Sequence, residues 1–135
     1  MTSIDLQLPD EQAARLDSFA RAVHKSRDEA TAQLIEEALR HEDYPAVEFR
    51  DSASGRQAYV VGSGLAVWEV LMVAMDYDLD PARTAAHLQW PPHRVESTLA
   101  YARRYPAEVR KALHENDAVT EPTLRQRLPN AIWTD

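Results

Sequence analysis

The first residues of the chain alternate between apolar and polar side chains. Ile4, Leu6 and Leu8 are separated by single polar residues, and this period of two predicts a short β-strand with one buried face. Pro9 ends the pattern, because proline cannot continue a strand ladder. Asp10 is then predicted to be the N-cap of a helix.

Apolar residues next recur at helical spacing in two successive segments. The first helix is predicted from residue 11 to about residue 23. Ser26 and Glu29 have the spacing of a capping box, so a second helix is predicted to start there and to run to about His41. We expect this helix to bury the apolar positions that recur on one face: Ala30, Leu34, Ile35, Ala38 and Leu39.

One short strand needs a partner strand, and a second copy of the chain supplies one. The order strand, helix, polar turn and helix in residues 2–41 resembles the ribbon-helix-helix family. The resemblance implies a homodimer joined through the N-terminal strand, with the ribbon's outward side chains on DNA bases. These outward positions are Ser3, Asp5 and Gln7.

The same resemblance implies that backbone amides near Ser26 and Arg27 hold a DNA phosphate. However, Asp5 is acidic where family ribbons usually carry arginine or lysine. Two copies of Asp5 would face the negatively charged duplex. A ribbon that only dimerises therefore stays open as an alternative to a ribbon that reads DNA.

After residues 41–45 the pattern changes from helical to strand-like. Residues 47–51 and 55–61 are rich in β-branched and aromatic side chains and flank a small polar turn, which predicts a hairpin. We expect Glu48 and Arg56 to face each other across it. Residues 65–75 are almost wholly apolar and rich in Leu, Met and Ala, so they predict a buried helix.

Two short motifs in this region favour structure over chemistry. Gly62, Ser63 and Gly64 lack the further glycine and the Lys-Ser/Thr pair of a phosphate loop. The aspartates at 76, 78 and 80 lack the rest of a calcium loop, and Asp80 is instead predicted to cap a helix that starts at Pro81. The histidines and acids show no metal-ligand or nucleophile–base spacing, so we predict no cofactor, metal site or enzyme activity.

Residues 81–104 predict a short helix, a tight turn and a longer helix, which is the order of a helix-turn-helix. Val95, Leu99 and Ala102 define the buried side of the longer helix. The opposite stripe consists of Arg94, Ser97, Tyr101 and Arg104. We interpret it as a DNA-contacting face, with Arg94 near a guanine edge and both Arg83 and Arg104 on phosphates. A solvated helix face is the alternative.

Charge supports this location for a nucleic-acid contact. The chain carries a formal net charge of -7, which argues against general binding to a polyanion. Residues 83–111 nevertheless hold six basic and two acidic side chains, so this segment is basic. The absence of cysteine excludes disulfides and cysteine-ligated zinc, and no run is long and apolar enough for a membrane span. We expect a cytoplasmic protein.

Residues 44–116 contain the motifs GRQAYVVG, VWEV, TAAHLQWP and AYARRYPAE in that order. On these motifs the segment resembles the bacterial domain-of-unknown-function family four-three-three, which has a helix-turn-helix-like fold. Members of that family are similar to VapB-type antitoxins and are typically encoded beside a PIN-like ribonuclease toxin. The resemblance implies an antitoxin that neutralises such a toxin and binds operator DNA. A free-standing transcription regulator and an interaction module without DNA binding are the alternatives.

The remaining residues, 117–135, contain two prolines and no pattern for a stable helix. We interpret them as a toxin-binding segment, in which an arginine enters the carboxylate cluster of the toxin. The candidate arginines are Arg125 and Arg127, and the candidate anchors are Leu128, Ile132 and Trp133. Packing of this tail on its own domain is the alternative.

Taken together, these patterns predict a mainly α-helical fold with short β-strands. Residues 1–42 are predicted to form a dimeric ribbon-helix-helix segment. Residues 43–116 are predicted to form a β-hairpin followed by a helix-turn-helix-like helical domain, and residues 117–135 a tail.

Overall fold

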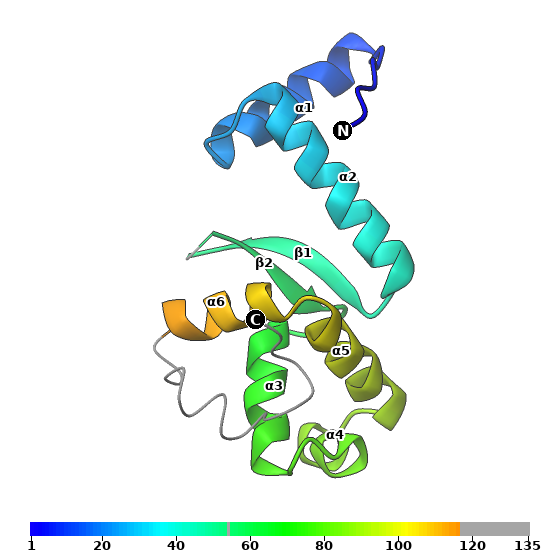
Figure 1. Ribbon diagram of the computed structural model, residues 1–135, viewed down its shortest axis with the longest axis vertical. Coiled ribbons are helices and arrows are strands. Elements are labelled where there is room, and N and C mark those ends of the chain that lie inside the picture. The colour runs from blue at the N-terminus through cyan, green and yellow to red at the C-terminus, as the bar shows by residue number, and fades with distance from the viewer. Residues whose placement is uncertain (54, 117–135) are drawn as a thin grey trace. The chain divides into compact units, whose positions relative to one another are not determined.

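A computed structural model describes residues 1–53 and 55–116 of the chain (Figure 1). In this range the protein forms six helices and one two-stranded antiparallel sheet, which confirms the predicted mainly helical fold with short strands. The chain divides into two compact units, Met1–Leu39 and the residues from Arg40 onward. The predictions for Arg125, Arg127, Leu128, Ile132 and Trp133 lie outside the described residues.

The first unit contains α1 (Asp10–Ala22) and most of α2 (Arg27–Asp43). Residues 1–9 adopt neither helix nor strand in this single chain, so the predicted ribbon is not formed here. Ribbon formation needs a second copy to supply the opposite strand. The N-cap prediction for Asp10 is wrong, because Pro9 is the capping residue and Asp10 is already helical.

The start of α2 follows from its local sequence. The amide of Glu29 donates to the Ser26 hydroxyl at 3.1 Å, and the Ser26 amide donates to the Glu29 carboxylate at 3.2 Å. This pair of bonds is the predicted capping box, and it satisfies two donors that a helix start otherwise leaves unbonded. His24 adopts a left-handed conformation, with φ of 57°, in the turn between the two helices.

The second unit begins with the last turn of α2 and the hairpin of β1 (Val47–Ser52) and β2 (Gly55–Val60). The strands pair in antiparallel register from Val47 opposite Val60 to Ser52 opposite Gly55. Glu48 therefore lies opposite Tyr59, and the prediction that it faces Arg56 is wrong. In this register Arg56 lies opposite Asp51 and forms an ion pair with it at 3.3 Å.

In the described part of the second unit, four helices follow the hairpin: α3 (Val67–Asp76), α4 (Pro81–Leu88), α5 (Pro92–Arg104) and α6 (Pro106–Glu115). The predicted cap of α4 is confirmed, because the Asp80 carboxylate accepts from the amides of Ala82 at 2.9 Å and Arg83 at 3.3 Å. Each of the last three helices begins with a proline at its first or second position, where the missing N–H carries no cost.

The hydrophobic core of the second unit surrounds α3, which contacts β2, α4, α5 and α6. It includes the fully buried side chains of Leu71, Leu99 and Leu113 from three different helices. The strands contribute Val47 and Val60, which are also fully buried. Among the described helices, none is both long and apolar enough to cross a membrane.

Candidate nucleic-acid interface

The basic segment of the chain forms a helix, a turn and a second helix, as its spacing predicts. Helix α4 ends at Leu88, and Gln89 then adopts a left-handed conformation with φ of 59°. The amide of Trp90 donates back to the carbonyl of Ala85 at 2.9 Å and closes the turn. Helix α5 packs against α4, α3 and α6. We call α4, the turn and α5 the helix-turn-helix element.

Helix α5 buries a wider arc than one stripe of apolar residues. Val95, Leu99 and Ala102 are buried, as predicted. Thr98 and Tyr101 are buried as well, each with no exposed area. The prediction that Tyr101 belongs to an outward stripe is therefore wrong. Neighbours on several sides of α5 cover both the apolar positions and the positions that flank them.

Tyr101 is instead the centre of a polar network inside the second unit. Its hydroxyl donates to the carboxylate of Glu108 and accepts from the Arg40 guanidinium at 3.1 Å. Arg40 also pairs with Glu108 at 2.8 Å and lies 3.9 Å from the centre of the Tyr105 ring. Burial, and then the negative charge of Glu108, raise the pKa of the Tyr101 phenol. This side chain connects α2, α5 and α6 and does not reach the surface.

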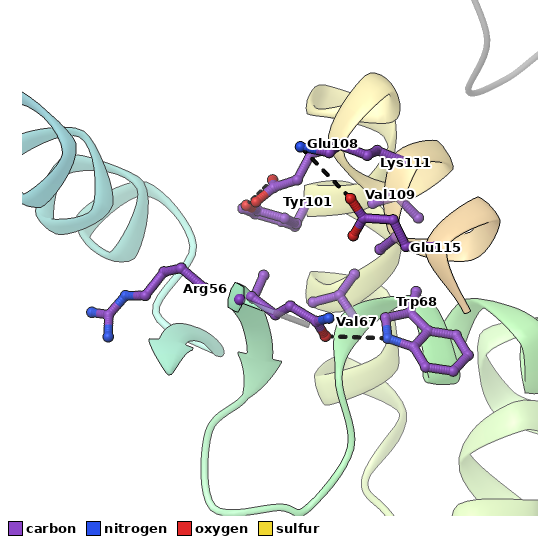
Figure 2. A pocket seen from close by; sticks show the side chains of 12 residues that line it. Arg56, Val67, Trp68, Tyr101, Glu108, Val109, Lys111 and Glu115 are labelled. Carbon is purple, nitrogen blue, oxygen red and sulfur yellow. Dashed lines mark hydrogen bonds and ion pairs between the residues drawn. The ribbon is translucent and has the colours of Figure 1, made fainter. Parts of the chain in front are cut away.

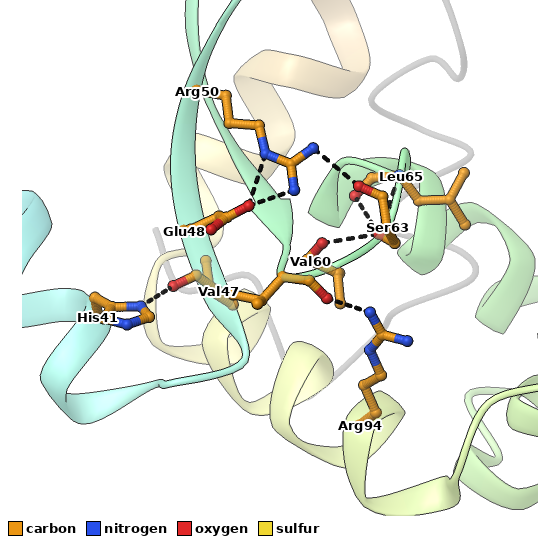
Figure 3. A network of polar contacts seen from close by, with 9 residues as sticks. His41, Val47, Glu48, Arg50, Val60, Ser63, Leu65 and Arg94 are labelled. Atoms are coloured by element: carbon orange, nitrogen blue, oxygen red, sulfur yellow. Dashed lines mark hydrogen bonds and ion pairs between the residues drawn. The ribbon is translucent and has the colours of Figure 1, made fainter.

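Arg94 is half-buried and is held from two sides, and Figure 3 shows the side that faces the loop. One terminal nitrogen donates to the backbone carbonyl of Val61, in the loop between β2 and α3. The guanidinium carbon lies 4.3 Å from the ring centre of Trp90. These contacts fix the guanidinium against the protein, so Arg94 does not extend outward along α5 as predicted.

The other predicted residues of this face are closer to solvent. Arg104 is exposed and its guanidinium lies 4.9 Å from the Tyr105 ring, whereas Ser97 is half-buried. Arg83 on α4 is exposed, with a guanidinium nitrogen 4.0 Å from a carboxylate oxygen of Asp78. The structure thus brings Arg94, Ser97 and Arg104 onto α5 but does not align them as one outward stripe.

The exposed face of α5 differs from the predicted stripe, because most exposed positions neighbour the predicted ones in the sequence. Its exposed side chains are Pro92, His93, Glu96, Arg103 and Arg104. His93 and Arg103 were not predicted to be on the outward face, because only Val95, Leu99 and Ala102 were expected to be buried. Their helical spacing of ten residues is compatible with one face, but only the packing around α5 shows which face is free.

In the first unit, the predicted base-contacting residues Ser3, Asp5 and Gln7 are exposed. Of the backbone amides predicted to hold a phosphate near Ser26 and Arg27, that of Ser26 is already used within the chain, and the Arg27 side chain is paired. The Ser26 amide bonds Glu29, and Arg27 donates to both carboxylate oxygens of Asp17 at 2.8 and 2.7 Å. The hydrogen bonds from Arg27 lower the pKa of Asp17, so a carboxylate already neutralises this arginine.

The first unit also presents an open apolar groove of about 470 Å³. Apolar residues of the N-terminal segment, α1 and α2 line it: Leu6, Leu8, Leu16, Phe19, Leu34, Ile35 and Ala38. The prediction that α2 buries Ile35, Ala38 and Leu39 is wrong for the single chain. Ile35 is 45% exposed and Leu39 is 56% exposed, because no element of this unit covers them.

A second cavity, of about 370 Å³, lies in the second unit between β2, the start of α3, α5 and α6 (Figure 2). Its polar side chains bond one another. Trp68 donates its indole N–H to Gln57 at 3.3 Å, and Lys111 pairs with Glu115 at 3.7 Å. Within the part of the chain that the structure describes, no three histidine or acidic side chains are grouped so as to hold a metal ion.

Comparison of the chain with protein-family models, with curated proteins and with solved structures found no match. The resemblances to the ribbon-helix-helix family and to family four-three-three rest on the motifs in residues 2–41 and 44–116. They stay predictions, and the geometry described above is the further basis for a functional proposal.

Proposed function

We propose that this protein is a homodimeric antitoxin of a type II toxin–antitoxin pair, which neutralises a PIN-like ribonuclease toxin and represses its own operon by binding operator DNA. Dimerisation is assigned to the first unit and DNA binding to the helix-turn-helix element. Toxin binding is assigned to residues 117–135, which lie outside the described residues.

The observation that carries the proposal is the uncovered apolar face of the first unit. Ile4 and Leu6 are 73% and 56% exposed, and they precede α1 on the segment that would form the ribbon. Ile35 and Leu39 are exposed on α2. A contiguous apolar surface of this kind typically marks a protein interface. A second copy that pairs its residues 3–8 with these would cover it, as the ribbon-helix-helix pattern implies.

Charge supports the assignment of DNA binding to the helix-turn-helix element. Residues 81–104 contain four arginines and one acidic residue, Glu96, in a chain with a net charge of -7. Arg103 and Arg104 are exposed at the end of α5, and Arg83 is exposed near the start of α4. A local excess of positive charge directs a polyanion to one part of an otherwise acidic protein.

A protein-interaction module without DNA binding is the second candidate. It is favoured by the burial of Tyr101 in an internal network, which removes this side chain from the predicted DNA face. The identity of the neighbouring gene distinguishes the antitoxin from a free-standing regulator that has no toxin. A small PIN-like reading frame beside this one supports the antitoxin.

The experiment co-expresses the chain with the product of the neighbouring gene and measures the mass of the purified complex by light scattering. We expect a complex that contains two copies of this chain. Deletion of residues 117–135 is expected to abolish toxin binding and to leave the dimer intact. An undiminished complex after the deletion would contradict the assignment of toxin binding to this segment.

The DNA assignment is tested by mobility shift with the upstream duplex. The Arg103→Ala/Arg104→Ala double variant is expected to bind more weakly than the wild type. Arg21→Ala/Lys111→Ala, at exposed positions outside both the groove and the helix-turn-helix element, is the matched control for loss of two positive charges. A wild-type dimer that shifts no DNA at low salt would favour the interaction module.

A further inference from the structure

Arg94 has no acidic partner among the described residues, whereas several other arginines of the second unit do. Arg40 pairs with Glu108 at 2.8 Å, and Arg56 pairs with Asp51 at 3.3 Å. Arg50 donates through Nε to Glu48 at 2.7 Å. Among the described residues, no carboxylate pairs with Arg94, and the only hydrogen bond of its side chain is to the Val61 carbonyl. Its positive charge is therefore not neutralised within the described chain.

The surroundings of Arg94 hold this charge in one place. The guanidinium is fixed between the Trp90 ring and the Val61 carbonyl, as Figure 3 shows for its contact with the loop. The loop lies against this side chain: Gly62 has φ of 73°, a conformation that glycine adopts readily, and a Cβ there would lie 3.4 Å from the Arg94 terminal nitrogen. Stacking on an aromatic ring and one carbonyl contact order the side chain without cancelling its charge.

The remaining guanidinium donors are open to solvent. An arginine has five N–H donors, and the bond to Val61 uses only one terminal nitrogen. None of the nitrogens of Arg94 is among the buried side-chain atoms that lack a hydrogen bond. A fixed, partly buried and uncompensated cation with open donors is a preorganised site for an anion.

The position of Arg94 points to phosphate and not to a base edge. Bidentate recognition of guanine requires an arginine that extends into the groove with both donors aligned on one base. Arg94 is instead held back on the first turn of α5, with part of its guanidinium committed to Val61. Contact with a backbone phosphate oxygen requires only that the duplex backbone passes close to this turn.

We propose that Arg94 binds a phosphate of the DNA backbone and that Trp90 is the positioning residue for its guanidinium. The inference rests on the proposed DNA-binding function and replaces the prediction that Arg94 reads guanine. In this role Arg94 contributes to DNA affinity and positions α5 on the duplex, but it does not discriminate between base sequences.

The test measures the affinity of the full chain for duplex DNA by fluorescence anisotropy as salt is varied, with the upstream duplex and with a duplex of unrelated sequence. Each phosphate contact contributes about 0.9 to the slope of log affinity against log salt. Arg94→Met is expected to lower that slope by about one per bound protomer and to weaken both duplexes about tenfold at low salt. Arg94→Lys is expected to keep the slope, because the charge remains.

Two variants separate this role from a structural one. Arg56→Met removes an arginine that already pairs with Asp51, so the salt slope is expected to stay unchanged. Trp90→Leu keeps the charge of Arg94 but frees its guanidinium, so the affinity is expected to fall a few-fold with the slope retained. Thermal melting of every variant shows whether the fold persists.

The outcomes distinguish this proposal from the function on which it rests. If the wild type binds DNA and Arg94→Met keeps the wild-type slope, Arg94 is a structural contact only and the phosphate site is overturned. A loss of affinity for the upstream duplex alone would show base recognition and would overturn it equally. If the wild type binds neither duplex at low salt, the proposed DNA binding fails and the phosphate site fails with it.

Discussion

The two units of this chain differ in how far each can bury its own apolar side chains. In the first unit, only Ala20 and Ala30 are buried, whereas Ile4, Leu6, Ile35 and Leu39 remain largely exposed. In the second unit, residues from the hairpin and from four helices form a continuous core. The second unit therefore has a core of its own, whereas the apolar face of the first unit is uncovered in the single chain, as the proposed dimer would require.

The largest expected effect comes from removing apolar volume in each unit. Leu71 is fully buried in α3, so Leu71→Ala is expected to lower the free energy of unfolding by about 2–5 kcal/mol. Leu39 is 56% exposed, so Leu39→Ala is expected to cost less than about 0.5 kcal/mol in the monomer. Urea unfolding at several protein concentrations measures both.

The concentration series sharpens the comparison. If a second copy covers the first unit, the cost of Leu39→Ala grows at concentrations where the wild type is dimeric. The cost of Leu71→Ala is expected to be similar at all concentrations. Equal losses for the two variants in the monomer would contradict the contrast between a covered and an uncovered unit.

A smaller effect is expected at the polar network of the second unit. Tyr101→Phe removes the hydroxyl that bonds Glu108 and Arg40, and it leaves their partly buried charges with fewer bonds. A loss of about 1–3 kcal/mol in the free energy of unfolding is expected. Tyr59→Phe on β2 is the control, because Tyr59 is half-buried outside this network. A loss for Tyr101→Phe no larger than for Tyr59→Phe would refute the network's contribution.

The same network predicts a pH dependence. The pKa of Tyr101 is raised in the folded protein, first by burial and then by Glu108. An unfolded chain releases this proton near pH 10, whereas the folded chain keeps it. The contribution of Tyr101 to stability is thus complete below about pH 10 and declines above it. Tyr101→Phe is expected to flatten that decline in unfolding experiments at alkaline pH.

The smallest expected effect is local to the first unit. Ser26→Ala removes the hydroxyl that caps α2 and is expected to cost about 1 kcal/mol. The Ser26 bonds lower the pKa of Glu29, so the Glu29 contribution is present at neutral pH and is lost as pH falls below about 4. Helicity measured by circular dichroism between pH 7 and pH 3 checks this. Ser18→Ala, on the exposed side of α1, is the control.

Short-range features of the fold were predictable from the sequence. The capping box of Ser26 and Glu29, the Asp80 cap and the hairpin turn each depend on residues a few positions apart. The boundaries of α4 and α5 follow from prolines and from the turn at Gln89 in the same way. Such elements form because their hydrogen bonds close within one or two turns of chain, so local sequence determines them.

Only the tertiary structure decided which side chains of these elements reach solvent. Tyr101 is polar at its tip and fits an exposed stripe by spacing, yet Arg40 and Glu108 bury it from positions 61 and 7 residues away. Arg94 is held by a carbonyl 33 residues earlier. Exposure depends on neighbours that are distant in the chain, and periodicity along one helix contains no information about them. Local sequence determined the helices and the hairpin, and packing between them decided which of their side chains reach solvent.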